Sequence, residues 1–204
     1  MIRRLLLLLI LLSAANFAYV ADPKNEVGLL LGGITTPDRN IVPGPGTINV
    51  STGITYQAIY ARLLKQTERV GIYFEVPFVA TPLQDVSSTN PAVPLNYASL
   101  FITPGVKFKF RPQERVSPFV AVGGGYARFD ESEDLVSGVP NPGPRGTNTG
   151  VFQFGGGFDV KVFSRISLRG EVRDFYSGRP QFNVATDSDR QHNVVFSGGF
   201  VIHF

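Results

Sequence analysis

Eight charged residues recur at alternate positions within segments that are otherwise rich in phenylalanine, valine and glycine. They are Glu75, Lys107, Lys109, Asp159, Lys161, Arg169, Glu171 and Arg173. Alternate residues of an extended strand point to the same face of a sheet, so these charged groups are expected to gather on one face. Breaking a buried ion pair typically costs about 3–5 kcal/mol, so opposite charges that leave water must pair. The spacing therefore predicts a buried network of ion pairs.

The predicted network has two alternative roles. As a structural plug it fills the interior of the fold, which is the interpretation that we favour. As a gate it controls a narrow conductance, because rearranged ion pairs can open a path for water.

Acidic residues in two loops raise the question of a metal site. The run Asp-Glu-Ser-Glu-Asp occupies 130–134, and Asp187 and Asp189 follow in a later loop. Such carboxylates could hold a divalent cation, but their spacing does not match an ordered calcium-binding loop. The glycine triplet at 123–125 lacks the following helix that a nucleotide-binding loop requires. We expect solvated loops, with no metal and no cofactor.

Eight segments show the alternation of polar and apolar residues that is typical of β-strands. They are 26–35, 52–64, 70–81, 99–110, 116–129, 152–162, 166–173 and 193–204. The faces of the fifth segment are hard to tell apart. Between the segments, long polar loops at 36–47, 83–96, 130–148 and 178–191 alternate with short turns at 65–69, 111–115 and 163–165. This asymmetry is typical of transmembrane β-barrels, which have an even number of antiparallel strands.

The last twelve residues carry the most specific pattern. One apolar face contains Val194, Phe196, Gly198, Phe200, Ile202 and Phe204. A terminal phenylalanine after alternating hydrophobic residues resembles the closing strand of bacterial outer-membrane β-barrels. Over the whole mature chain the resemblance is to the small OmpA/OmpX-like barrels, so we predict an all-β fold, an eight-stranded antiparallel up-and-down transmembrane β-barrel. The resemblance implies that the barrel-insertion machinery reads a C-terminal signal made of Phe196, Phe200, Ile202 and Phe204.

Alternation alone does not decide which face meets lipid, because a soluble ligand-binding barrel alternates too. The interior of an eight-stranded barrel is only just wide enough for side chains, and the predicted apolar faces would overfill it. The charged faces carry glycines, which are expected to make room for long charged side chains in a narrow lumen. The apolar faces of four segments lack charge, as expected where a midplane lysine or arginine costs about 2–4 kcal/mol.

The N-terminal residues have the layout of a secretory signal peptide. Arg3 and Arg4 precede the apolar block 5–12 and the small residues 13–15. The block is shorter than the roughly 20 residues of a spanning helix, which argues against a retained anchor. We predict a signal peptide at 1–21, cleaved between 15 and 21, and a barrel domain at 22–204.

Residues that could support covalent catalysis are scarce. The chain has no cysteine and only two histidines, His192 and His203, so it offers no thiolate and few bases. His203 is expected in the lumen or at a turn. His192 is expected near the external rim, but it lacks the His-x-Ser pattern of the deacylase barrels. We therefore predict no catalytic residue and no enzymatic activity.

These observations predict a monomeric integral protein of the Gram-negative outer membrane, with both termini in the periplasm. Its expected partners are outer-membrane lipid, lipopolysaccharide and the barrel-insertion machinery. A net charge of +3 without a basic cluster argues against nucleic acid. We expect a structural or surface-interaction role with a plugged lumen. The alternatives are a narrow pore, a soluble periplasmic ligand-binding barrel and a lipid-modifying outer-membrane enzyme.

Overall fold

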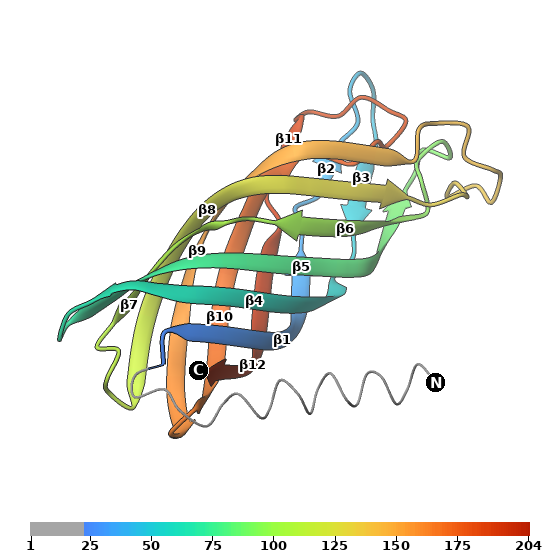
Figure 1. The fold of residues 1–204 in the computed structure, drawn as a ribbon. Helices are drawn as coiled ribbons and strands as arrows, with labels where there is room; N and C mark the ends of the chain where they lie inside the picture. The colour runs from blue at the N-terminus through green and yellow to red at the C-terminus, as the bar shows by residue number, and fades with distance from the viewer. Residues whose placement is uncertain (1–22) are drawn as a thin grey trace, which may run out of the picture.

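The computed structural model describes residues 23–204, which form a closed antiparallel barrel (Figure 1). The predicted signal peptide at 1–21 lies outside the described residues. The strands are β1 (Asn25–Thr35), β2 (Arg39–Asn40), β3 (Thr47–Val50), β4 (Gly53–Gln66), β5 (Val70–Ser88), β6 (Asn96–Ile102), β7 (Gly105–Phe110), β8 (Val116–Glu131), β9 (Gly146–Phe163), β10 (Ile166–Gly178), β11 (Arg190–Gln191) and β12 (Val194–His203). No helix within 23–204 is long and apolar enough to cross a membrane.

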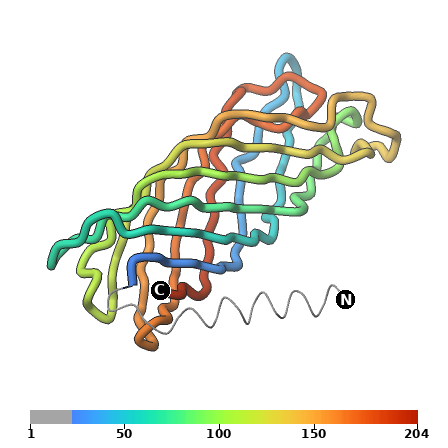
Figure 2. The backbone as a smooth tube through the Cα atoms, viewed as in Figure 1, coloured from blue at the N-terminus to red at the C-terminus, as the bar shows by residue number. Residues whose placement is uncertain are grey.

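Eight strands make the wall, which confirms the predicted fold. Each pairs antiparallel with its neighbour in the order β1, β4, β5, β6 with β7, β8, β9, β10 and β12. The seam between β12 and β1 closes the wall, from Glu26 opposite His203 to Thr35 opposite Val194. Figure 2 shows how strongly the strands tilt as they wrap around the barrel. Closure leaves no free sheet edge in the wall, as a barrel in lipid requires.

The two ends of the barrel differ. The three short turns and the C-terminus lie at one end, which we call the turn end, and the long connections lie at the other, the loop end (Figure 1). Asn25 and Phe204 exchange backbone hydrogen bonds of 2.8 and 2.9 Å, so the first described strand also begins at the turn end.

The strands continue further toward the loop end than the sequence predicted. β5 runs to Ser88, through residues predicted as loop, because β3 pairs with its far end from Ile48 opposite Ser88. The first long connection, predicted as an irregular loop, contains the paired strands β2 and β3. At Pro104 one wall strand is interrupted between β6 and β7, because proline has no N–H to donate to the hydrogen bonds of the sheet.

Along the wall strands, the predicted apolar faces point outward and the predicted polar faces point into the barrel. Phe74 and Phe78 are exposed on the outer face of β5, and Glu75 between them is buried. The faces of β8, which the sequence left undecided, are now clear: Phe119 and Phe129 point inward, and Val120 points outward.

The ion-pair clusters occupy the interior only toward the turn end, whereas the sequence predicted a polar lumen throughout. Toward the loop end it holds what we call the aromatic plug, which consists of Tyr97, Phe101, Phe129, Phe175 and Phe182. All five side chains are buried, and their rings pack edge to face or stacked with centroids 4.9–6.2 Å apart. Phe182 comes from the last long connection, so a loop residue completes the plug.

Inward glycines allow neighbouring strands to approach closely. A Cβ on Gly157 would lie 2.2 Å from the Gly170 carbonyl oxygen, and one on Gly199 would lie 2.1 Å from that of Leu29. The sequence explained these glycines as room for side chains, but at both positions the nearest atom belongs to the backbone. Glycine is needed there because the strand curves sharply around a narrow barrel.

We expect Gly199→Ala to destabilise the seam between β12 and β1. The new methyl group must push backbone away, and overpacking of this kind costs about 1–3 kcal/mol or more. Gly198→Ala is the matched control, because its Cβ would point outward and meet nothing closer than 3.5 Å. Urea unfolding in detergent micelles, followed by circular dichroism, measures both variants. Equal unfolding midpoints would contradict the close-approach explanation.

Candidate functional site

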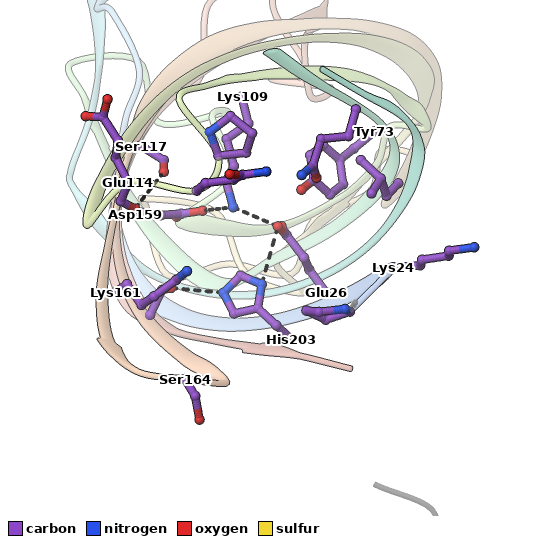
Figure 3. Close-up of a pocket in the computed structure, with 16 residues that line it drawn as sticks. Lys24, Glu26, Tyr73, Lys109, Glu114, Ser117, Asp159, Lys161, Ser164 and His203 are labelled. Carbon is purple, nitrogen blue, oxygen red and sulfur yellow. Dashed lines mark hydrogen bonds and ion pairs between the residues drawn. The ribbon is translucent and has the colours of Figure 1, made fainter. Parts of the chain in front are cut away.

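The charged lumen begins at the turn end with a group of side chains around Glu26 (Figure 3). Lys107 Nζ donates to Glu26 Oε2 at 2.5 Å, and Lys109 Nζ donates to Oε1 at 2.7 Å. Lys109 also lies 2.6 Å from Asp159 Oδ2. Arg169 binds Asp159 through Nε at 2.6 Å and Nη2 at 2.8 Å, and reaches Glu26 at 3.3 Å. We call these five buried residues the Glu26 cluster.

A second group lies deeper, centred on a fully buried arginine. Arg173 Nη1 donates to Glu75 Oε1 at 2.6 Å, and Nε and Nη2 donate to the two oxygens of Glu171 at 2.7 and 3.0 Å. Gln57 adds a 2.6 Å hydrogen bond to Glu171. Each carboxylate therefore has at least one strong donor. We call Glu75, Glu171 and Arg173, with Gln57, the Arg173 cluster.

Sequence reasoning missed Glu26, which the structure places at the centre of the first cluster. The predicted set held three acids and five bases, an excess of two positive charges that a buried network would not tolerate. That imbalance was the available signal for a missing carboxylate. Glu26 is the second residue of β1 and lies on the face opposite Val27 and Leu29, so alternation places it inward.

The structure does not bring Lys161 into the network. Its side chain is exposed, and no ion pair of Lys161 is found within 23–204. Lys161 lies one strand repeat closer to the turn end than Asp159, where the lumen opens to solvent. With Glu26 included and Lys161 excluded, the two clusters contain four carboxylates and four cations.

A cavity of about 470 Å³ opens at the turn end below the Glu26 cluster. Figure 3 shows Glu26, Lys109, Asp159 and His203 pointing into it. His203 lies within 3.5 Å of Glu26 through Nδ1 and within 2.9 Å of Ser167 Oγ through Nε2. Both ring nitrogens therefore have protein partners, and the structure places this histidine in the lumen.

The loop end is closed by connections that bind each other. Arg39 of β2 is buried and donates to the Ser188 and Arg190 carbonyls, both at 3.0 Å, and to Gln191 Oε1 at 3.1 Å. Burial lowers the pKa of its guanidinium from the usual value. On the other side, Val136 N donates to the Val93 carbonyl at 2.9 Å. Asn183 of the last loop donates to the Ala92 carbonyl at 3.1 Å and so joins the two pairs of loops into one connected cap above the aromatic plug.

The carboxylates of five predicted loop acids bind protein groups, and these acids are Asp130, Glu131, Glu133, Asp187 and Asp189. Asp130 pairs with Arg128 at 2.6 Å, and Glu133 pairs with Arg145. Glu131, predicted in a solvated loop, ends β8 instead and is buried, where it accepts a 2.6 Å hydrogen bond from Gln181 N. The described residues contain no group of acids and histidines with the geometry of a metal site.

The predicted C-terminal signal residues lie along one face of β12. Phe196, Phe200 and Ile202 are exposed on the outer surface, and Phe204 follows the strand half-buried. His192, the other candidate base, also faces outward, at the loop end beside Asp174.

We expect Arg173→Ala to lower the free energy of unfolding by about 3–5 kcal/mol, because it leaves two buried carboxylates without their cation. Arg111→Ala is the control, since its pairing with Glu114 is 3.5 Å long and exposed at a turn. Urea titration in micelles measures both variants. A midpoint for Arg173→Ala equal to that of the control would show that the cluster does not stabilise the barrel.

Comparison with known proteins agrees with this geometry. No family model matches the sequence, and no curated protein matches it either. Among solved structures, Neisserial surface protein A has a TM-score of 0.58 at 12% identity, with coverage of 88% of this chain and 97% of that one. The outer membrane protein OprG from Pseudomonas aeruginosa has the same TM-score and identity, with coverage of 90% and 97%. The chain therefore has the fold of the small OmpA/OmpX-like β-barrels of the bacterial outer membrane.

Proposed function

We propose that this protein is a monomeric integral barrel of the outer membrane with a closed lumen, and that it acts structurally or through surface contacts of its loops. The observation that carries this proposal is that several layers of side chains block the lumen, one after another along its axis. The Glu26 and Arg173 clusters, whose charges balance only when the two are taken together, are followed by the aromatic plug and the connected loops. No catalytic residue forms part of the proposal.

The outer surface supports a location in lipid. Large apolar side chains are exposed all around the wall, and among them Leu29, Phe78, Phe158 and Phe200 are between 44% and 63% exposed. A water-soluble protein rarely exposes so continuous an apolar surface. The same observation argues against the soluble ligand-binding alternative, which would turn these side chains inward.

The difference between the two ends supports an orientation. Transmembrane barrels of bacteria have short turns on the periplasmic side and long loops outside. The turn end, with the C-terminus, would then face the periplasm, and the loops would face the exterior. In this orientation the aromatic residues of β12 that the insertion machinery is expected to read face lipid.

The narrow pore remains the second candidate because of the cavity at the turn end. That cavity gives water access to Glu26 and Lys109 but ends at the Glu26 cluster. Conductance would require both clusters and the aromatic plug to rearrange. The aromatic plug cannot open by exchange of ion pairs, and it therefore favours the closed barrel.

Cell fractionation and gel mobility test the location and the fold together. We expect the protein in the outer-membrane fraction, with a detergent-gel mobility that shifts on boiling, because a closed barrel resists the detergent until it is heated. A soluble periplasmic protein without a shift would overturn the proposal.

Planar-bilayer recording tests the closed lumen. We expect no resolved channels from the wild-type protein and none from Glu171→Ala, although this variant should unfold at a lower temperature. The aromatic plug still blocks the lumen when the Arg173 cluster is weakened. A marked rise in single-channel current with unchanged stability would favour the narrow pore instead.

A further inference from the structure

Exposed cations are concentrated at the turn end of the barrel. They come from the chain at the start of β1, from the last residues of two wall strands and from the three turns, and they are Lys24, Arg62, Lys65, Arg69, Arg111, Arg115, Lys161 and Arg165. We call these eight residues the basic rim. The exposed side-chain carboxylates at this end of the described chain are Glu68 and Glu114. The turn end therefore presents a strongly positive surface.

The two ends of the barrel differ in how their cations are paired. At the loop end, three arginines have carboxylate partners, and the pairs are Arg128–Asp130, Arg145–Glu133 and Arg179–Asp189. In the basic rim, six cations have no ion pair with any residue of 23–204, and they are Lys24, Arg62, Lys65, Arg69, Arg115 and Lys161. Unpaired charges of one sign create a potential that attracts an anionic surface.

The basic rim directly adjoins the apolar outer wall. Arg62 lies on the outward face of β4 between Tyr60 and Leu64, whose side chains are 39% and 61% exposed. Elsewhere a cation of the rim is next in the chain to an exposed apolar residue, and the pairs are Leu64–Lys65, Phe110–Arg111 and Arg115–Val116. Long basic side chains can lay their stems on apolar surface and extend their charge to lipid headgroups. The rim therefore lies where the lipid-facing surface ends.

The cations are also distributed around the whole wall. In the order of the paired strands they lie at the start of β1, between β4 and β5, between β7 and β8, and between β9 and β10 (Figure 1). A lipid leaflet surrounds a barrel on every side and can reach all of these positions at once. A compact acidic protein would reach only some of them from one side.

We infer that the basic rim binds the phosphodiester headgroups of anionic phospholipids in the leaflet that surrounds the turn end. Arginine donates two parallel hydrogen bonds to phosphate oxygens, and lysine supplies a point charge. Phosphatidylglycerol fits better than phosphatidylethanolamine, whose ammonium group offsets the charge of its own phosphate. This inference rests on the proposed location in the outer membrane. The proposed orientation makes the leaflet the periplasmic one.

Lipid retention tests the inference. The purified full-length barrel is equilibrated with mixed micelles of detergent and phosphatidylglycerol, phosphatidylethanolamine or neutral diacylglycerol, and the lipid that stays bound through gel filtration is quantified by mass spectrometry. We expect preferential retention of phosphatidylglycerol. This retention should fall as salt is added, because the rim is exposed and its charge is screened. The salt series needs only the wild-type protein, so it tests the inference without any variant.

The variant Arg62→Gln/Lys65→Gln/Arg69→Gln removes three neighbouring cations of the rim. We expect phosphatidylglycerol to bind more weakly by about fivefold for each cation removed. The matched control is Arg128→Gln/Arg145→Gln/Arg190→Gln, which removes the same charge from exposed positions at the loop end. The control should retain phosphatidylglycerol as the wild type does.

Three results would overturn the inference. They are equal retention of phosphatidylglycerol and phosphatidylethanolamine by the wild type, equal losses in the two triple variants, and binding of soluble polyglutamate without retention of phosphatidylglycerol. The last result would assign the rim to an acidic polymer. A wild-type protein that keeps its outer-membrane location and heat-dependent mobility but shows no preference for phosphatidylglycerol would refute this inference alone. Loss of location and mobility would refute the proposed function.

Discussion

The narrowness of an eight-stranded barrel is the constraint on which the rest of the structure depends. The lumen is only about as wide as the side chains that fill it, so charged groups from opposite walls must meet. Glu26 on β1 contacts Lys107 and Lys109 on β7, and Arg173 on β10 contacts Glu75 on β5. These pairs join strands that are not neighbours in the sheet. The lumen contacts therefore tie the wall together from within, in addition to its backbone hydrogen bonds.

The same narrowness explains why the interior is divided. Charges are concentrated toward the turn end, where the cavity brings water close to the Glu26 cluster. Toward the loop end the interior is sealed by Phe101, Phe175 and Phe182, which need no partners for buried charge. The four acids and four bases of the two clusters balance in charge, and the aromatic rings that follow them need no counter-charge.

Much of this arrangement could be predicted from the sequence, because a strand in a barrel imposes a strict period of two. That period identified the wall strands, the outward face of β12 and seven of the eight charged residues in the lumen. The same alternation places Phe101 and Phe175 on the inward face with Lys107 and Arg173. Part of the aromatic plug could therefore be predicted from the sequence, but a search for charged residues alone overlooks it. Lys161 lies on the same face of its strand as Asp159, but at the end where the lumen opens to solvent. Alternation shows which face a residue occupies and does not show how deep in the lumen it lies.

Other features leave no periodic signal. Phe182 belongs to a loop, and its place in the plug depends on how that loop folds over the barrel. The pairing of β3 with β5 is likewise set by contacts between segments that are far apart in the sequence. The Asp174–His192 pair joins residues 18 positions apart, and only the register of β10 with β12 brings them together. Asp174 is an exception on the otherwise apolar outward face of β10, which also carries Leu168 and Val172. In the structure, its position at the end of that face gives the exception a physical reason, because a carboxylate is tolerated where the lipid-facing surface ends.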